Sequence, residues 1–141
     1  MIGLLIWLAA PAAQAFPARL ERAIEYAESG GDPWAKRGVC RGLWQVDSRW
    51  ASPLVRKSPA LLYDPETARA EGRRALRGWL RACGGDMTCA LRGFRCGWAG
   101  VRGECGSSYA ASVQSAASKA HWSVDYIADH CRDCPECCAV D

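Results

Sequence analysis

The chain has 141 residues, of which 50% are hydrophobic and 23% are charged. This length fits one ordinary domain, and the apolar content is enough for a buried core, which argues against intrinsic disorder. The formal net charge of +3 is too small to indicate nucleic-acid binding by itself, although a mildly basic surface suits a polyanionic polymer.

Residues 1–15 predict a secretory signal peptide. They carry no charged side chain, run apolar from Ile2 to Ala10, and end in the small-x-small pattern Ala13-Gln14-Ala15. No Lys or Arg precedes the apolar run, so the α-amino group of Met1 is its only positive end. The alternative is an N-terminal helix packed in the core, whereas a membrane-spanning anchor would need about 18 apolar residues.

The first helix is predicted to begin at Pro17 and to stop at Gly30-Gly31. Its apolar residues recur at i, i+3, i+4 and i+7, namely Leu20, Ala23, Ile24 and Ala27. Residues 32–59 are rich in Pro, Gly, Trp and Ser without a sustained period, so they predict loops around a short helical turn near residues 43–46.

The strongest helix signal is Asp64-Pro65-Glu66, with an N-cap side chain, a proline at the first helical position and a carboxylate in the first turn. This helix should run to about Ala82 and end at Gly84-Gly85. The residues expected on its inner face are Ala68, Gly72, Ala75, Leu76, Trp79, Leu80 and Cys83.

Two shorter helices are predicted at residues 86–93 and 108–118, and one more helical turn at 124–128. No segment shows the period-2 alternation of a strand, so the predicted class is mainly α. We therefore divide the chain into the signal peptide at 1–15, one domain at 16–120 and a cysteine-rich tail at 121–141.

Nine cysteines in so short a chain indicate an oxidising compartment, which means the periplasm or the cell exterior. Five of them lie in the body, at Cys40, Cys83, Cys89, Cys96 and Cys105. Because this number is odd, either one of them pairs with the tail or at least one thiol stays free. A bond between Cys83 and Cys89 would staple the loops around the Gly84-Gly85 turn.

The tail has the spacing Cys131-x-x-Cys134-x-x-Cys137-Cys138, with His130 beside it. One interpretation of this spacing is a metal or iron–sulfur site. However, zinc sites usually pair two separated clusters of ligands, and the tail has only one incomplete cluster. Disulfides are the favoured reading for an exported chain, and we predict no metal.

Glu28 is the candidate catalytic residue. It lies near the end of the first helix, one position beyond the apolar stripe, so its carboxyl group should sit at the rim of the core. Partial desolvation and the negative end of the helix dipole both disfavour ionisation, which raises the pKa toward the range that a general acid needs. Taken alone, the residue also fits a surface glutamate near a helix end.

Several short motifs follow one another in a specific order. They are Glu28-Ser29-Gly30, Gly42-Leu43-Trp44-Gln45, Asp64-Pro65-Glu66 with Gly72 and Leu76 downstream, Ala90-Leu91, and Phe94-Arg95-Cys96-Gly97. The ordered set resembles the soluble lytic transglycosylase family, whose pattern is a Glu-Ser pair, a Gly-Leu-Met-Gln turn, an Asp-Pro-led helix with an internal Gly, and Ala-Leu-x-x-Tyr-Asn-x-Gly. The resemblance implies a lysozyme-like single domain.

The resemblance also implies roles for individual residues. Glu28 would be the acid and base, Gln45 would lie in the sugar cleft, and Ser29 would shape the site. The glycines Gly42 and Gly97 would let the backbone approach the glycan.

Three departures from the family pattern affect these roles. Trp44 replaces the family's Met and would form an apolar wall beneath a sugar ring. Phe94-Arg95 replaces Tyr-Asn, and an Arg95 that points at Glu28 would lower its pKa. Tyr109 is then the candidate for the missing hydroxyl. The loop before Gly42 is also about one residue shorter than in the family and lacks a substrate-binding Ser.

The implied function is cleavage of the bond between N-acetylmuramic acid and N-acetylglucosamine in peptidoglycan, with 1,6-anhydromuramyl products and no cofactor. The alternatives are a hydrolytic lysozyme, with Asp32 or Asp47 activating water, and a non-catalytic glycan-binding protein. The expected partner is the peptidoglycan glycan strand rather than nucleic acid. Work within a secretion, pilus or phage apparatus would suit such an enzyme.

Overall fold

The computed structural model describes residues 15–119. In chain order its elements are α1 (Ala18–Ser29), β1 (Lys36–Arg37), β2 (Cys40–Arg41), β3 (Val46–Asp47), η2 (Ser48–Trp50), α2 (Pro53–Lys57), η3 (Pro59–Tyr63), α3 (Pro65–Ala82), α4 (Met87–Cys96), α5 (Trp98–Val101) and α6 (Ser107–Ser118). The mainly α class is confirmed. The helical turn predicted at 124–128, the cysteine tail and nearly all of the predicted signal peptide lie outside the described residues.

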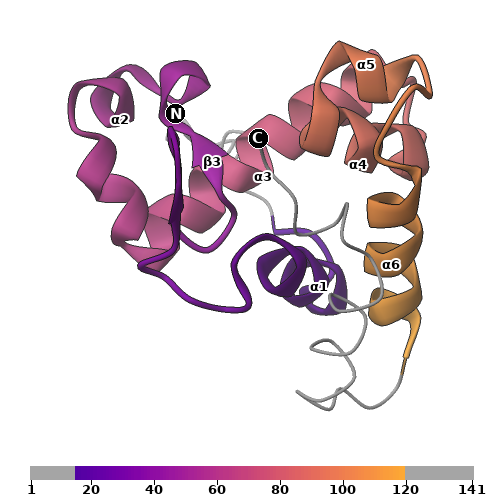
Figure 1. Ribbon diagram of the computed structural model, residues 1–141, viewed down its shortest axis with the longest axis horizontal. Coiled ribbons are helices and arrows are strands. Elements are labelled where there is room, and N and C mark those ends of the chain that lie inside the picture. The colour runs from indigo at the N-terminus through magenta and orange to yellow at the C-terminus, as the bar shows by residue number, and fades with distance from the viewer. Residues whose placement is uncertain (1–14, 120–141) are drawn as a thin grey trace, which may run out of the picture.

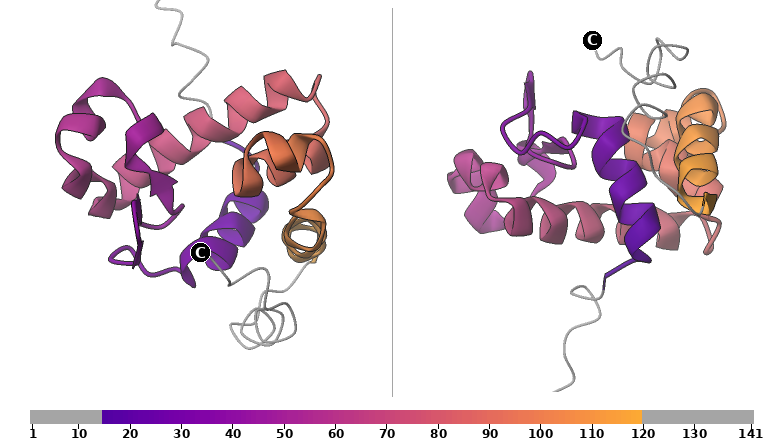
Figure 2. Two further views of the ribbon diagram at one scale, coloured as in Figure 1. Left: turned by 45° about the horizontal axis from the view of Figure 1, so that its top comes forward. Right: turned by 90° about the horizontal axis from the view of Figure 1, so that it is seen from below.

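The long helix α3 connects two groups of elements (Figure 1). The strands, α2 and the 3-10 helices η2 and η3 gather around its first half, and α4, α5 and α6 gather around its second half (Figure 2). Helix α1 packs against α6. The two groups are therefore joined by one continuous helix, with α1 placed against the second group.

Helix α1 follows the sequence prediction closely. Gly30 takes the left-handed conformation (φ 65°) at its end, where its N–H bonds to the carbonyl of Tyr26 at 2.9 Å. Glycine adopts this conformation without the penalty that a Cβ brings. The face that the helix buries includes Leu20, Ala23 and Ile24. It also includes three glutamates, Glu21, Glu25 and Glu28.

Helix α3 begins as predicted. The carboxylate of Asp64 accepts hydrogen bonds from the backbone N–H and the hydroxyl of Thr67, both at 2.8 Å, which satisfies an amide that the first helical turn leaves unpaired. The helix ends where predicted, at Ala82. Gly72 on its inner face contacts the ring of Trp44 so closely that a Cβ at this position would overlap the indole.

A small antiparallel sheet with the strand order β1-β2-β3 was not expected from the sequence. Each strand has two residues, which is too short for alternation to be recognised. Strands β1 and β2 are joined by the two residues Gly38-Val39, and Gly38 has a φ of 57°. A glycine at the first position of a two-residue loop is a hairpin signal.

The helical turn predicted near residues 43–46 is wrong. The chain makes a hydrogen-bonded turn there, from the N–H of Gln45 to the carbonyl of Gly42 at 3.1 Å, and then enters β3. Gly42 and Gln45 have φ values of 77° and 47°, which a right-handed helix cannot contain. Short helices occur further along instead, in η2, α2 and η3.

Helix α4 extends three residues beyond its predicted end, so that Phe94 and Arg95 belong to its last turn. The predicted disulfide between Cys83 and Cys89 is present, and a second one joins Cys96 to Cys105. Both bonds tie the ends of α4 to the neighbouring loops. Within residues 15–119, Cys40 is the cysteine that has no disulfide partner, and no helix in that range is long and apolar enough to cross a membrane.

Candidate active site

A cavity of about 730 Å³ opens on the side of α1 that carries Glu28. Its walls come from the end of α1, the sheet, η2, the middle of α3, the last turn of α4 and the start of α6. Five residues predicted for the site line it, namely Glu28, Gln45, Phe94, Gly97 and Tyr109. The structure therefore brings together residues that lie as far as 81 positions apart in the sequence.

Glu28 is more deeply buried than the sequence indicated. Only 4% of the residue is exposed, although its carboxyl group belongs to the cavity wall. Burial raises the pKa of this carboxyl group above its ordinary value of 4.5, because the ionised form loses water. The charges of Arg95 and Arg37 and the hydroxyl of Tyr109 act in the opposite direction but do not outweigh burial.

Arg95 does point at Glu28. Its Nη1 lies 3.4 Å from Oε2 of the carboxyl group, and both side chains are about nine-tenths buried. Since the pKa of Glu28 nevertheless stays raised, a cation in place of the family's amide weakens the tendency to hold a proton without abolishing it. The guanidinium also lies 5.5 Å from the centre of the Tyr109 ring, which places all three side chains in one cluster.

The hydroxyl of Tyr109 lies beside the Glu28 carboxyl group and favours its ionised form, although the pair does not reach full hydrogen-bond geometry. Burial, followed by the nearby charge of Glu28, raises the pKa of the Tyr109 hydroxyl. The structure thus places the hydroxyl of a tyrosine on α6 next to the candidate acid.

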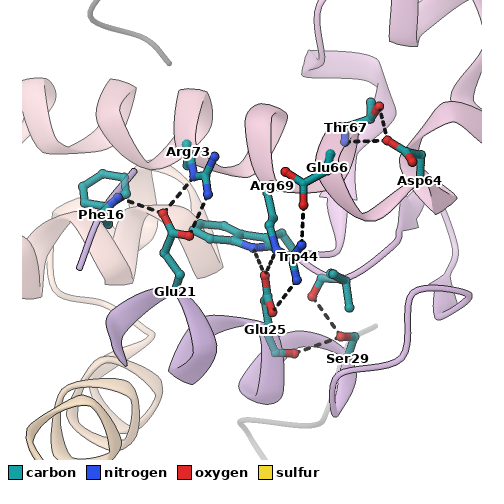
Figure 3. A network of polar contacts seen from close by, with 11 residues as sticks. Phe16, Glu21, Glu25, Ser29, Trp44, Asp64, Glu66, Thr67, Arg69 and Arg73 are labelled. Atoms are coloured by element: carbon teal, nitrogen blue, oxygen red, sulfur yellow. Dashed lines mark hydrogen bonds and ion pairs between the residues drawn. The ribbon is translucent and has the colours of Figure 1, made fainter. Parts of the chain in front are cut away.

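Ion pairs between α1 and α3 hold the helix that carries Glu28 (Figure 3). Arg73 donates from Nε and Nη2 to the two carboxylate oxygens of Glu21, each at 2.8 Å. One turn further on, Nε of Arg69 donates to Glu25 Oε1 at 2.7 Å. Although burial raises the pKa of Glu21, hydrogen bonds from Arg73 and Phe16 and the arginine charges lower it more, so this pKa lies below its ordinary value. Both glutamates therefore serve to position α1.

Trp44 belongs to the core and not to the cavity wall. It is 0% exposed, its Nε1 donates to Glu25 Oε1 at 3.1 Å, and its ring packs edge-on against Phe94 with 6.0 Å between centroids. A sugar ring cannot stack on an indole without exposed surface, so we do not propose the sugar wall expected from the sequence. Trp44 instead supports Phe94, which does line the cavity.

Ser29 and Gln45 fix the backbone around the site. The hydroxyl of Ser29 donates to the carbonyls of Glu25 and Leu43, both at 2.9 Å, which ties the end of α1 to the turn before β3. Nε2 of Gln45 donates to the carbonyls of Ala35 and Gly42 at 3.0 and 2.9 Å. Ser29 is not among the lining residues, whereas Gln45 is.

The two glycines differ in what they do. Gly97 lines the cavity at the end of α4 with a φ of 64°, and a Cβ there would meet nothing within 4 Å. Gly42 lies away from the cavity wall, and a Cβ there would overlap the carbonyl oxygen of Leu62. Close packing on η3 therefore explains Gly42, whereas Gly97 leaves open space at the site.

Several lining residues were not identified from the sequence, including Arg37, Cys40, Trp50 and Trp79. Trp50 is 79% exposed. Burial, followed by the neighbouring charges of Asp47 and Glu28, raises the pKa of the Cys40 thiol. The hairpin signal at Gly38-Val39 could have placed Arg37 and Cys40 side by side, but nothing local indicates which wall the hairpin would form.

Three other carboxylates line the cavity, and each pairs with an arginine close in sequence. The pairs are Asp47 with Arg49 at 2.7 Å, Glu71 with Arg74 at 3.1 Å, and Glu104 with Arg102 at 2.6 Å. Asp32 is absent from the lining and accepts a hydrogen bond from the N–H of Trp34. Glu28 is thus the lining carboxyl group that combines deep burial with a raised pKa, which is how a general acid is arranged.

A family model for the transglycosylase SLT domain matches residues 6–116. The chain therefore belongs to the transglycosylase SLT domain family, whose members act on peptidoglycan. No curated protein and no solved structure matches the chain. In the part of the chain that the structure describes, no group of three or more His, Cys, Asp or Glu side chains is arranged to hold a metal ion.

Proposed function

We propose that the chain is a lytic transglycosylase that cleaves the β-1,4 bond between N-acetylmuramic acid and N-acetylglucosamine, with Glu28 as its acid and base. The observation that supports this proposal most directly is the raised pKa of a deeply buried carboxyl group on the wall of an open cavity. Membership of the SLT family supplies the substrate class.

In the proposed reaction, Glu28 donates its proton to the glycosidic oxygen as the bond breaks, and the substrate's own N-acetyl group stabilises the cationic sugar carbon. The ionised carboxylate then takes the proton from the muramic 6-hydroxyl, whose oxygen bonds to that carbon and closes a 1,6-anhydro ring. One carboxyl group thus gives and regains the same number of protons. The attacking hydroxyl is already tethered to the reacting sugar, which favours the intramolecular step.

Asp47 supports a second candidate function, hydrolysis by a lysozyme mechanism, because it is a carboxylate in the same cavity as Glu28. Hydrogen bonds from the side chain and the backbone N–H of Arg49, together with the charge of this arginine, lower the pKa of Asp47 despite its partial burial. A carboxylate of lowered pKa is a weaker base for activating water. The pairing of Asp47 with Arg49 therefore supports ring closure over hydrolysis.

Digestion of purified peptidoglycan tests which reaction occurs. We expect 1,6-anhydromuramyl products without new reducing ends, because no water is consumed, and mass spectra should show fragments one water lighter than those from a lysozyme digest run in parallel. Fragments with reducing ends that incorporate labelled oxygen from solvent water would contradict the transglycosylase proposal and favour the lysozyme.

Removing the charge of Arg95 should change the pH dependence of cleavage. Glu28 must be protonated to act as an acid, so the rate falls as pH rises through its pKa. Because the charge of Arg95 lowers that pKa, the substitution Arg95→Gln should raise it and move the alkaline limb of the kcat/KM profile to higher pH.

The matched control for this experiment is Arg56→Gln, which removes an exposed arginine on α2 outside the cavity lining and should leave the profile where it is. An Arg95→Gln profile that stays in place or moves to lower pH would show that Arg95 does not tune the acid.

The disulfides and the cysteine content support the further proposal that the chain works in the periplasm or outside the cell. Its partner there would be the glycan strand itself. A secretion, pilus or phage apparatus is a fitting setting for local opening of the wall.

A further inference from the structure

Arg37 lies on the cavity wall, in a hairpin that is fixed by hydrogen bonds. It stands in β1 opposite Cys40 of β2, next to the Gly38-Val39 loop. The carbonyl of Ala35, two residues before it, accepts hydrogen bonds from the N–H of Gly42 at 2.9 Å and from Nε2 of Gln45 at 3.0 Å. The backbone that carries Arg37 is therefore fixed relative to the rest of the site.

Among the described residues, the ion pairs around the cavity leave Arg37 without a counterion. Of the lining arginines, Arg74 pairs with Glu71, and Arg95 pairs with Glu28. The remaining lining carboxylates pair with Arg49 and Arg102, as described above. Nη1 of Arg37 is buried, and it has no hydrogen-bond partner among the described residues.

In the described part of the chain, Oε1 of the lining residue Gln45 is also buried without a partner, and the hydroxyl of Tyr109, although it lies beside Glu28, makes no full hydrogen bond. Buried polar atoms are nearly always hydrogen-bonded, so their concentration on one cavity indicates that a ligand completes them. For Arg37 the missing partner must be an acceptor, and the planar guanidinium matches a carboxylate best.

The position of Arg37 also relates it to the reacting bond. Its charge is close enough to Glu28 to act on the ionisation of that carboxyl group. An anion bound to Arg37 would therefore belong to a sugar near the bond that is cleaved. Muramic acid carries a carboxylate on its lactyl ether or on the peptide attached there, whereas N-acetylglucosamine carries none.

We propose that Arg37 binds a carboxylate carried by the muramic residue and so selects muramic-containing glycan over neutral N-acetylglucosamine polymers. This inference rests on the proposed function for the substrate class. Binding of such an anion would also affect Glu28. An anion that neutralises Arg37 removes one of the charges that lower the pKa of Glu28. The anionic substrate thus helps to keep the acid protonated.

Binding measured by calorimetry in a Glu28→Gln background tests the inference without relying on turnover. The ligands are alternating muramic–glucosamine oligosaccharides in three forms, which are bare strands with the lactyl carboxylate, strands with the peptide attached, and bare strands with the carboxyl group reduced to an alcohol. Arg37→Gln should weaken binding of a carboxylate form by about tenfold or more and leave binding of the reduced form unchanged.

Two further variants separate charge from structure. Arg37→Lys keeps the charge and should recover part of the affinity. Lys36→Gln removes the exposed neighbouring cation of the same strand, which is not a lining residue, and should bind every form as the parent does. Weaker binding of bare strands identifies the lactyl carboxylate as the ligand, and weaker binding of only the peptide form identifies the carboxylates of the peptide.

An equal loss for carboxylate and reduced forms, or no loss for any form, would overturn the role of Arg37 whether or not the wild type cleaves peptidoglycan. Selective, Arg37-dependent binding together with an inactive wild type would leave the inference standing and overturn only the proposed catalysis. Failure of the Glu28→Gln parent to bind any of the three forms would overturn both.

Discussion

The substitution Glu28→Gln is expected to lower the rate of glycan cleavage by at least about two orders of magnitude, which is the scale for removal of a general acid. Glutamine keeps the shape of the side chain but has no proton to donate to the glycosidic oxygen and cannot accept one from the 6-hydroxyl. Release of soluble fragments from purified peptidoglycan measures the effect. If the variant still cleaves peptidoglycan, Glu28 is not the general acid.

The same variant should remain folded. A carboxyl group whose pKa is raised in the folded state contributes stability below its ordinary pKa of 4.5 and loses it as pH rises through the folded value. At neutral pH the wild type therefore gains nothing from Glu28, and Glu28→Gln should unfold at the same temperature or a higher one. Glu66→Gln, an exposed carboxylate on α3, is the matched control and should cleave at the wild-type rate.

The substitution Gly42→Ala is expected to reduce the free energy of unfolding by about 3 kcal/mol or more. The added Cβ would overlap the carbonyl oxygen of Leu62, and this backbone atom cannot move aside as a flexible side chain would. Alanine would also have to adopt the φ of 77° found at this position. Urea unfolding measures the change.

Gly38→Ala separates these two contributions. Gly38 also has a positive φ, of 57°, but a Cβ there would meet nothing within 4 Å. Its substitution should cost only the backbone penalty, about 1–2 kcal/mol. Equal losses for the two variants would mean that the contact with Leu62 contributes nothing.

Local signals were enough to predict the ends of α1 and α3 from the sequence. The N-cap side chain of Asp64, the proline after it and the glycines that end each helix act through neighbouring residues, so their effect does not depend on the rest of the fold. The apolar periodicity of α1 likewise predicts Glu28 at the rim of the core, but it does not predict how deeply the residue is buried.

Features that depend on distant contacts could not be predicted in this way. Trp44 looked like a sugar wall because an indole suits either a core or a cleft, and the choice depends on Gly72, 28 residues later in the chain. Likewise, the sequence predicts that an Arg95 pointing at Glu28 lowers the pKa of this carboxyl group. Only the folded structure shows that burial outweighs this charge.

The ion pairs between α1 and α3 do not by themselves fix where Glu28 lies relative to α3. At this contact Glu21 pairs with Arg73, and Glu25 pairs with Arg69. Arg77 follows Arg73 at the same spacing, so charge alone would also permit a slip of one turn, with Glu21 against Arg77 and Glu25 against Arg73. Because this shift spans four residues of α3, it would displace Glu28 by about 6 Å. Trp44 opposes this slip because it contacts both helices. Its buried indole donates a hydrogen bond to Glu25 of α1 and packs against Gly72 of α3, where a Cβ would overlap the ring. An uncharged side chain thus decides which of two equally charged alignments brings the carboxyl group to the cavity.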